Sequence, residues 1–136
     1  MKNTLRRVRI TLIAISVAAV VAVPRSGFAR TQEARALKVP STVHGLVGGE
    51  SHDAYRLDVR KGEHLVVRLG WRAEKGTRAE ATLSTSAAFE NAEPLTGGKW
   101  SADGREWTGT VGETGTIYVY VVAHPSAHYT LRILRK

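Results

Sequence analysis

The 136-residue sequence contains no cysteine. This absence excludes a disulfide framework, a thiol nucleophile and a lipoprotein anchor attached to cysteine. It also removes the commonest ligands of structural zinc sites.

Sequence signatures of the common enzyme classes are missing as well. No serine lies in a GxSxG context, so none is marked as the nucleophile of a Ser-His-Asp site. The glycine-bearing stretches GLVGGE and LTGGKW match neither a P-loop nor a dinucleotide-binding fingerprint. The sequence therefore predicts a protein that is not an enzyme and that binds no cofactor.

Only one long apolar run is present, residues 10–23, and it lies near the N-terminus. Basic residues precede it, Pro24 ends it, and Gly27 and Ala29 place small residues where a signal peptidase reads. This is the layout of a secretory signal peptide. The 14-residue run is shorter than the roughly 20 residues that a spanning helix needs. We expect cleavage after Ala29, export to the periplasm or the extracellular space, and no stable membrane insertion afterwards.

Net charge is much lower once the signal peptide is set aside. Of the 20 Lys and Arg residues five lie within residues 1–29, which leaves 15 against 12 acidic residues, a net charge of +3. These charges are interspersed along the chain, as on a solvated surface. The sequence therefore does not predict a nucleic-acid partner.

Apolar residues after the signal alternate with a period of two, which is typical of strands with one buried face. The alternating segments are 55–59, 65–71, 79–83 and 117–123, with glycine-rich turns between them. No segment has the pattern of an amphipathic helix. We expect an all-β fold, a small antiparallel β-sandwich, in which residues 30–40 are a linker and residues 41–136 form a single domain.

The stretch KWSADGREW predicts a hairpin, because Asp-Gly is a strong signal for a two-residue turn. A loop at Asp103 and Gly104 places Trp100 opposite Trp107 on one face. We expect this aromatic pair to define the register and to cover core. The alternative is a stacking platform for a sugar or a partner protein.

The end of the chain, YVYVVAHPSAHYTLRI, predicts a second hairpin. With residues 125–127 as its loop, Val121 faces Leu131, and His124 faces His128 on the exposed side. Two histidines fall short of the three or four ligands of a zinc site. The sequence therefore predicts a turn here and no metal site, although His124 and His128 are the residues that would capture a metal ion.

Residues 42–134 resemble the pre-peptidase C-terminal domains of secreted bacterial proteins. The resemblance lies in the frame VHGLVGGESHDAYRLDVRKGEHLVVRL, GTVGETGTIYVYV and SAHYTLRI. It implies a jelly-roll-like β-sandwich, as in domains that follow secreted peptidases and in some collagen-binding modules. Such motifs specify turns and core, so they report the fold better than the function.

The same frame is similar to that of periplasmic inhibitors of g-type and i-type lysozyme, in which a Ser-Gly-x-Tyr loop sits at the lysozyme active site. The matching stretch here is Thr114, Gly115, Thr116, Ile117 and Tyr118. Threonine replaces serine, isoleucine occupies the tyrosine position, and Tyr118 follows one place later, on the other face of the strand.

Two functions follow from these patterns and remain open at the level of sequence. The first is an exported, non-enzymatic binding protein with a protein partner in the cell envelope, with lysozyme as the suspected partner. The second is a surface-polymer or matrix-binding module for peptidoglycan, polysaccharide or collagen. Candidate partner-binding residues are Thr114, Gly115, Thr116, Tyr118, Trp100 and Trp107.

Overall fold

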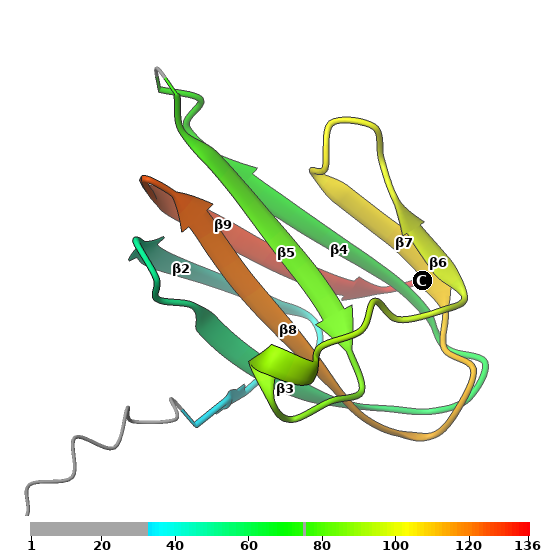
Figure 1. The fold of residues 1–136 in the computed structure, drawn as a ribbon. Coiled ribbons are helices and arrows are strands. Elements are labelled where there is room, and N and C mark those ends of the chain that lie inside the picture. The colour runs from blue at the N-terminus through cyan, green and yellow to red at the C-terminus, as the bar shows by residue number, and fades with distance from the viewer. Residues whose placement is uncertain (1–32, 75) are drawn as a thin grey trace, which may run out of the picture.

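The computed structural model describes residues 33–74 and 76–136, which form nine strands and one short 3₁₀ helix (Figure 1). The predicted signal peptide, residues 1–29, lies outside the described residues. The elements in chain order are β1 (Arg35–Ala36), β2 (Ser41–Gly48), β3 (Asp53–Val59), β4 (His64–Trp71), β5 (Arg78–Ser84), η1 (Phe89–Asn91), β6 (Gly98–Trp100), β7 (Glu106–Thr110), β8 (Gly115–His124) and β9 (Ser126–Arg135).

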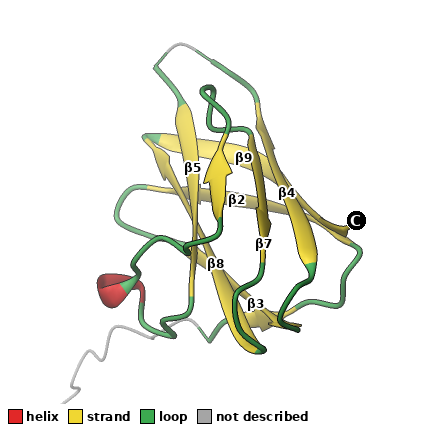
Figure 2. Cartoon of the chain, turned by 90° about the vertical axis from the view of Figure 1, so that its right-hand side faces the viewer, coloured by secondary structure: helices red, strands yellow, loops and turns green. Residues whose placement is uncertain are grey.

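Two sheets pack face to face, as Figure 2 shows from the side. The first sheet has the strand order β1-β3-β8-β5, and the second has the order β2-β9-β4-β7-β6. All pairs are antiparallel except β1 with β3. The structure confirms the predicted all-β sandwich.

The core lies between the sheets and is built from the alternating positions that the sequence marks. On β8, the side chains of Ile117, Val119, Val121 and Ala123 are at most 2% exposed. The four segments predicted as strands correspond to β3, β4, β5 and β8. Burial of apolar side chains contributes about 25 cal/mol per Å² removed from water, so this alternation is what orients each strand.

The β6–β7 hairpin has the predicted register, with Trp100 paired to Trp107. Its turn is longer than the predicted two residues. The Gly104 N–H donates to the Ser101 carbonyl at 2.9 Å, and the Ser101 N–H donates to the Glu106 carbonyl at 2.7 Å. A two-residue type I′ turn needs positive φ at both central residues. Only Gly104 has it here, at 71°, so Asp103 lies within a wider turn.

The predicted C-terminal hairpin is wrong. β8 and β9 follow one another in the chain but belong to different sheets, and the chain crosses between the sheets at Pro125. His124 pairs with Arg78 of β5, whereas His128 pairs with Leu46 of β2. Val121 and Leu131 are both fully buried, as predicted, but from opposite sheets. The two histidines are therefore not a cross-strand pair.

The segment expected to be a linker joins the sandwich in part. Arg35 and Ala36 form β1 along the edge of β3, and Leu37 and Val39 pack against the core. Within residues 33–74 and 76–136, the structure has no helix that is long and apolar enough to cross a membrane.

Candidate functional site

The candidate loop of residues 112–118 lies at one end of the sandwich, where β7 passes into β8. The β3–β4 turn lies beside it, at the lower end in Figure 1. Two backbone hydrogen bonds join the two connections: the Gly62 N–H donates to the Val111 carbonyl and the Val111 N–H donates to the Glu63 carbonyl, both at 2.8 Å. Gly62 has a φ of 89°, which the tight β3–β4 turn requires.

Two threonines of the loop are anchored by hydrogen bonds to that neighbouring turn and strand. The Thr114 hydroxyl oxygen accepts a hydrogen bond from the Lys61 backbone N–H at 3.0 Å, which leaves its own proton available. The Thr116 hydroxyl donates to Asp58 Oδ1 at 3.2 Å. Thr114 therefore presents a donor to a partner, whereas the Thr116 proton is already used within the protein.

Hollows lie on both sides of the loop. One has a volume of about 640 Å³ and is lined by Thr114, Gly115 and Thr116 together with the β3–β4 turn and Arg135. The other, of about 480 Å³, is lined by the same three residues together with Leu95 and Thr96. Gly115 is exposed between them, and a Cβ built on it meets nothing within 4 Å. Residues 112–116 thus form a ridge between the two hollows, which carries no side chain at Gly115.

Two of the four charged side chains that line the larger hollow are paired with one another. Arg135 Nε lies 3.2 Å from Glu63 Oε2, and the same guanidinium donates to the Asp58 carbonyl at 3.0 Å. Arg60 and Lys61 are exposed on the β3–β4 turn. Within the described part of the chain there is no group of three or more His, Cys, Asp or Glu side chains that could hold a metal ion. The arrangement supplies hydrogen-bond donors and positive charge for recognition.

Tyr118 lies on a different surface from the loop. Ile117, in the tyrosine position of the resembled motif, is buried in the core at 2% exposure. The Tyr118 ring is on the outer face of its sheet, where it stacks beside Tyr120 at 6.2 Å between centroids. Tyr118 and the ridge at Gly115 therefore do not form one compact site.

The two candidate tryptophans lie apart from the ridge, in the β6–β7 hairpin, where Trp107 pairs with Val67 in the middle of β4. Trp107 is 2% exposed, and its ring occupies the space that side chains at Gly98 and Gly109 would fill. Trp100 is half-buried and packs against the core. Trp107 is thus inaccessible to a partner in the folded state, whereas part of Trp100 is accessible.

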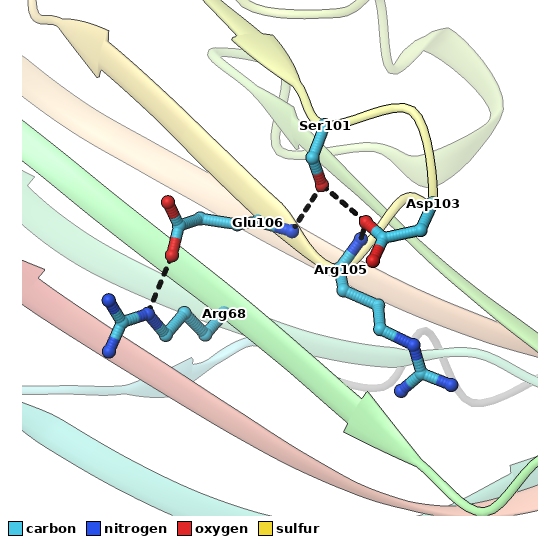
Figure 3. Close-up of polar contacts among 5 residues, drawn as sticks. All are labelled: Arg68, Ser101, Asp103, Arg105 and Glu106. Carbon is cyan, nitrogen blue, oxygen red and sulfur yellow. Dashed lines mark hydrogen bonds and ion pairs between the residues drawn. The ribbon is translucent and has the colours of Figure 1, made fainter.

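A polar network holds the turn beyond these tryptophans (Figure 3). Asp103 Oδ1 accepts hydrogen bonds from the Ser101 hydroxyl at 2.6 Å and from the Arg105 N–H at 3.1 Å. These bonds, first that from Ser101, lower the pKa of Asp103. Glu106 pairs with Arg68 of β4 at 2.7 Å.

The sequence reasoning missed an aromatic cluster on the outer face of the first sheet. Phe89 of η1 stacks on His52 at 4.3 Å between centroids and meets Tyr120 edge-on at 5.4 Å. The Tyr120 hydroxyl donates to the Ser86 carbonyl at 2.6 Å. The segment between β5 and β6 is thereby fastened to the sheet. Phe89 lies in no alternating pattern, so the sequence carried no signal for this contact.

The sequence matches no protein-family model and no curated protein. Several solved structures share its fold. A periplasmic inhibitor of g-type lysozyme from Aeromonas hydrophila superposes with a TM-score of 0.62 at 15% identity, over 76% of this chain and 96% of that one. The pre-peptidase C-terminal domain of a Bacillus anthracis collagenase gives 0.55 at 19% identity, over 75% and 95%. A periplasmic g-type lysozyme inhibitor from Salmonella Typhimurium gives 0.53 at 16% identity, over 76% and 99%. The predicted likeness to these two groups is confirmed at the level of fold.

Proposed function

We propose that this chain is an exported binding protein that inhibits a lysozyme through the ridge formed by residues 112–116. The observation that carries the proposal is the ridge itself, an exposed turn anchored on the β3–β4 turn and flanked by two hollows. The likeness in fold to two periplasmic lysozyme inhibitors supports this choice of partner. Loops on a rigid scaffold are where binding residues concentrate.

The chemistry of the ridge suits the cleft of a glycosidase. Such clefts carry paired carboxyl groups on either side of the scissile bond. The Thr114 hydroxyl supplies a hydrogen-bond donor, and the exposed Arg60 and Lys61 place positive charge on the adjoining turn. Because Gly115 adds no bulk, the backbone of the ridge can approach the floor of a narrow cleft closely.

Substitution of Gly115 by tryptophan tests the ridge. The site is exposed and free of neighbours within 4 Å of a built Cβ, so the fold should tolerate the ring. The bulk should keep the ridge out of the cleft and raise the inhibition constant by roughly 100-fold, the loss typical of a central contact in an interface. Inhibition of cell-wall lysis by c-, g- and i-type lysozymes is the readout.

Gly70→Trp is the matched control, since Gly70 lies within β4 and a Cβ built there meets only ordinary contacts at 3.9 Å or more. It should inhibit as the wild type does. Equal inhibition by Gly115→Trp and the wild type would place the inhibitory surface elsewhere. If no lysozyme is inhibited by the wild type, pull-down on insoluble peptidoglycan tests the polymer-binding alternative.

Export is part of the proposal and has its own test. The basic start, apolar run and Gly27/Ala29 site predict a mature chain that begins at or near Arg30. N-terminal sequencing of protein from the periplasmic or extracellular fraction should find that start. A chain that retains Met1 in that fraction would contradict it.

A further inference from the structure

The sandwich is open along one side, between β5 and β6. β5 is the last strand of the first sheet, and β6 is the last strand of the second. Figure 2 shows β6 between β5 and β7, where the second sheet turns towards the first. No ladder of hydrogen bonds joins β5 to β6 in the described chain.

Backbone groups of both strands point into this opening. N–H and C=O groups of one residue in an antiparallel strand point to the same side, and the side alternates along the strand. Leu95 N–H donates to the Leu83 carbonyl from outside the sheet at 2.7 Å, so Ala79 and Ala81 also point outward. On either side of β6, Gly97 and Ser101 form hydrogen bonds with β7, so the backbone groups of Gly98 and Trp100 point away from β7. Within the described residues, Ala79 and Ala81 have no backbone partner on the open side.

A hollow of about 280 Å³ occupies this opening and is lined by residues 78–82 and 100–104. Its volume is near the lower end of the roughly 300–1,000 Å³ of ligand pockets. Ala79 and Ala81 have small side chains, and the half-buried Trp100 supplies an apolar wall. An added side chain of moderate size would cover apolar surface that this chain leaves partly exposed.

The charged side chains around the opening differ in whether another side chain neutralises them. Arg78 and Glu80 neutralise one another at 2.9 Å on the outer face of β5. Arg105 is held away from the hollow, because its guanidinium stacks over Trp71 at 3.7 Å from the ring centroid. The Asp103 carboxylate makes no ion pair with any described residue. The end of the hollow beside Asp103 therefore favours a positive group.

Charged side chains on an edge strand commonly serve to prevent association, and Arg78 and Glu80 do this on one face. They leave the hollow unfilled and the backbone groups of Ala79 and Ala81 free. We propose that the opening receives an extended segment of a partner protein, which adds to β5 as a strand, places an apolar residue on Trp100 and Ala81, and places a lysine or arginine beside Asp103.

A single extended segment suits the opening better than a second copy of this domain. The β5 edge of another copy would bring its own second sheet along, and residues 100–104, which line the hollow opposite β5, would obstruct that sheet. A terminus or an unfolded loop has no such attachment, and strand addition of this kind is a recurring mode of peptide recognition. The opening lies beside the 101–104 turn, away from the Gly115 ridge, so this inference does not rest on the proposed function.

The open edge is tested first in the protein alone by amide hydrogen exchange. Amides of Glu80 and Thr82 pair with β8 and should be protected, whereas those of Ala79 and Ala81 should exchange much faster. Equal protection of all four amides would overturn the proposal, because the edge would already be covered.

Binding is tested with an acetylated heptapeptide of alternating threonine and valine that ends in lysine amide. At millimolar peptide, NMR should show shifts at the amides of Ala79 and Ala81 and at the Trp100 indole. N-methylation of every second peptide residue removes the donors of one edge and should weaken binding at least about tenfold. No shift at these positions, or equal binding of the methylated peptide, would overturn the proposal.

Protein variants supply the matched comparison. Ala81→Pro removes only an N–H that points outward, so it should abolish peptide binding while the melting temperature changes little. Asp103→Lys should weaken binding of the lysine peptide. It provides the comparison with the wild type if Ala81→Pro does not fold. Gly115→Trp should bind the peptide as the wild type does, which separates this surface from the lysozyme-binding ridge.

Discussion

Val121→Asp is expected to leave no folded domain at 25 °C. Val121 is 0% exposed at the middle of β8, paired with Asp53 of β3 on one side and Ala81 of β5 on the other. Its side chain points into the core between the sheets. A buried carboxylate without a cationic partner costs several kcal/mol, and the domain has only about 5–15 kcal/mol of stability in total.

His124→Ala is the control at the end of the same strand. His124 is exposed, and surface substitutions of this kind usually change the free energy of unfolding by about 0.5 kcal/mol or less. Urea unfolding followed by tryptophan fluorescence measures both variants. Comparable losses in the two would show that the inner and outer faces of β8 are wrongly assigned.

Tyr129→Phe is expected to lower the free energy of unfolding by about 2–4 kcal/mol, because the buried Tyr55 hydroxyl and the half-buried Asp53 carboxylate both lose their hydrogen-bond partner. The Tyr129 hydroxyl donates to Asp53 and accepts a hydrogen bond from the Tyr55 hydroxyl, each at 2.5 Å. Tyr129 belongs to β9 and the other two to β3, so the network ties the two sheets together. Gly45 makes room for the ring, because a Cβ there would lie 2.5 Å from it.

The same network predicts a loss of stability at alkaline pH. Burial, followed by the hydrogen bonds to Asp53 and Tyr55, raises the pKa of Tyr129 far above its ordinary value of 10.0. Above pH 10 the unfolded chain releases this proton and the folded chain retains it, so the free energy of unfolding falls as the pH rises. Below pH 10 the full contribution is present.

Chemical unfolding between pH 8 and pH 11.5 checks both statements about Tyr129. Tyr129→Phe should be less stable at pH 8 and should show a shallower decline above pH 10. The free energy of unfolding of Tyr129→Phe should still fall somewhat above pH 10, because burial also raises the pKa of Tyr120. Tyr118→Phe, on the outer face, should match the wild type at pH 8. An unchanged slope in Tyr129→Phe would show that its phenol is not held neutral by the fold.

Sequence patterning sufficed for the strands and for their inner faces. Alternation over 55–59 and 117–123 reports which residues are buried, and burial is a property of each strand by itself. The register of Trp100 with Trp107 was also predictable, because a turn of few residues restricts the pairing to one choice. The wider turn was not, since it depends on the Ser101–Asp103 hydrogen bond.

The pairing of the C-terminal strands β8 and β9 could not be predicted from the alternation of apolar residues. Val121 and Leu131 are buried whether they are neighbours on one sheet or face each other across the core, so alternation fits both arrangements equally. Only the partner strands decide between them: β2 lies about 85 residues before β9, and β5 lies about 40 residues before β8. Local pattern carries no information on such distant pairings.

The location of the ridge in the sequence could be predicted, but the hydrogen bonds of its side chains could not. The resemblance to lysozyme inhibitors pointed to Thr114 and Gly115, which the structure places at the exposed junction where the loop ends and β8 begins. It did not indicate that Asp58 accepts the Thr116 proton, because these residues are 58 positions apart in sequence and meet only through the pairing of β3 with β8. Glycines within strands were the overlooked signal: Gly45 and Gly98 mark the close approach of Tyr129 and Trp107.

The central claim, that this chain is a lysozyme inhibitor acting through the ridge at Gly115, is tested most directly by a titration of the purified wild-type protein. Lysis of cell-wall substrate by c-, g- and i-type lysozymes is measured as the protein is added, with Gly115→Trp titrated in parallel. We predict inhibition of at least one class at micromolar concentration or below, and its loss in Gly115→Trp. Undiminished lysis by all three classes at micromolar wild-type protein would contradict the claim.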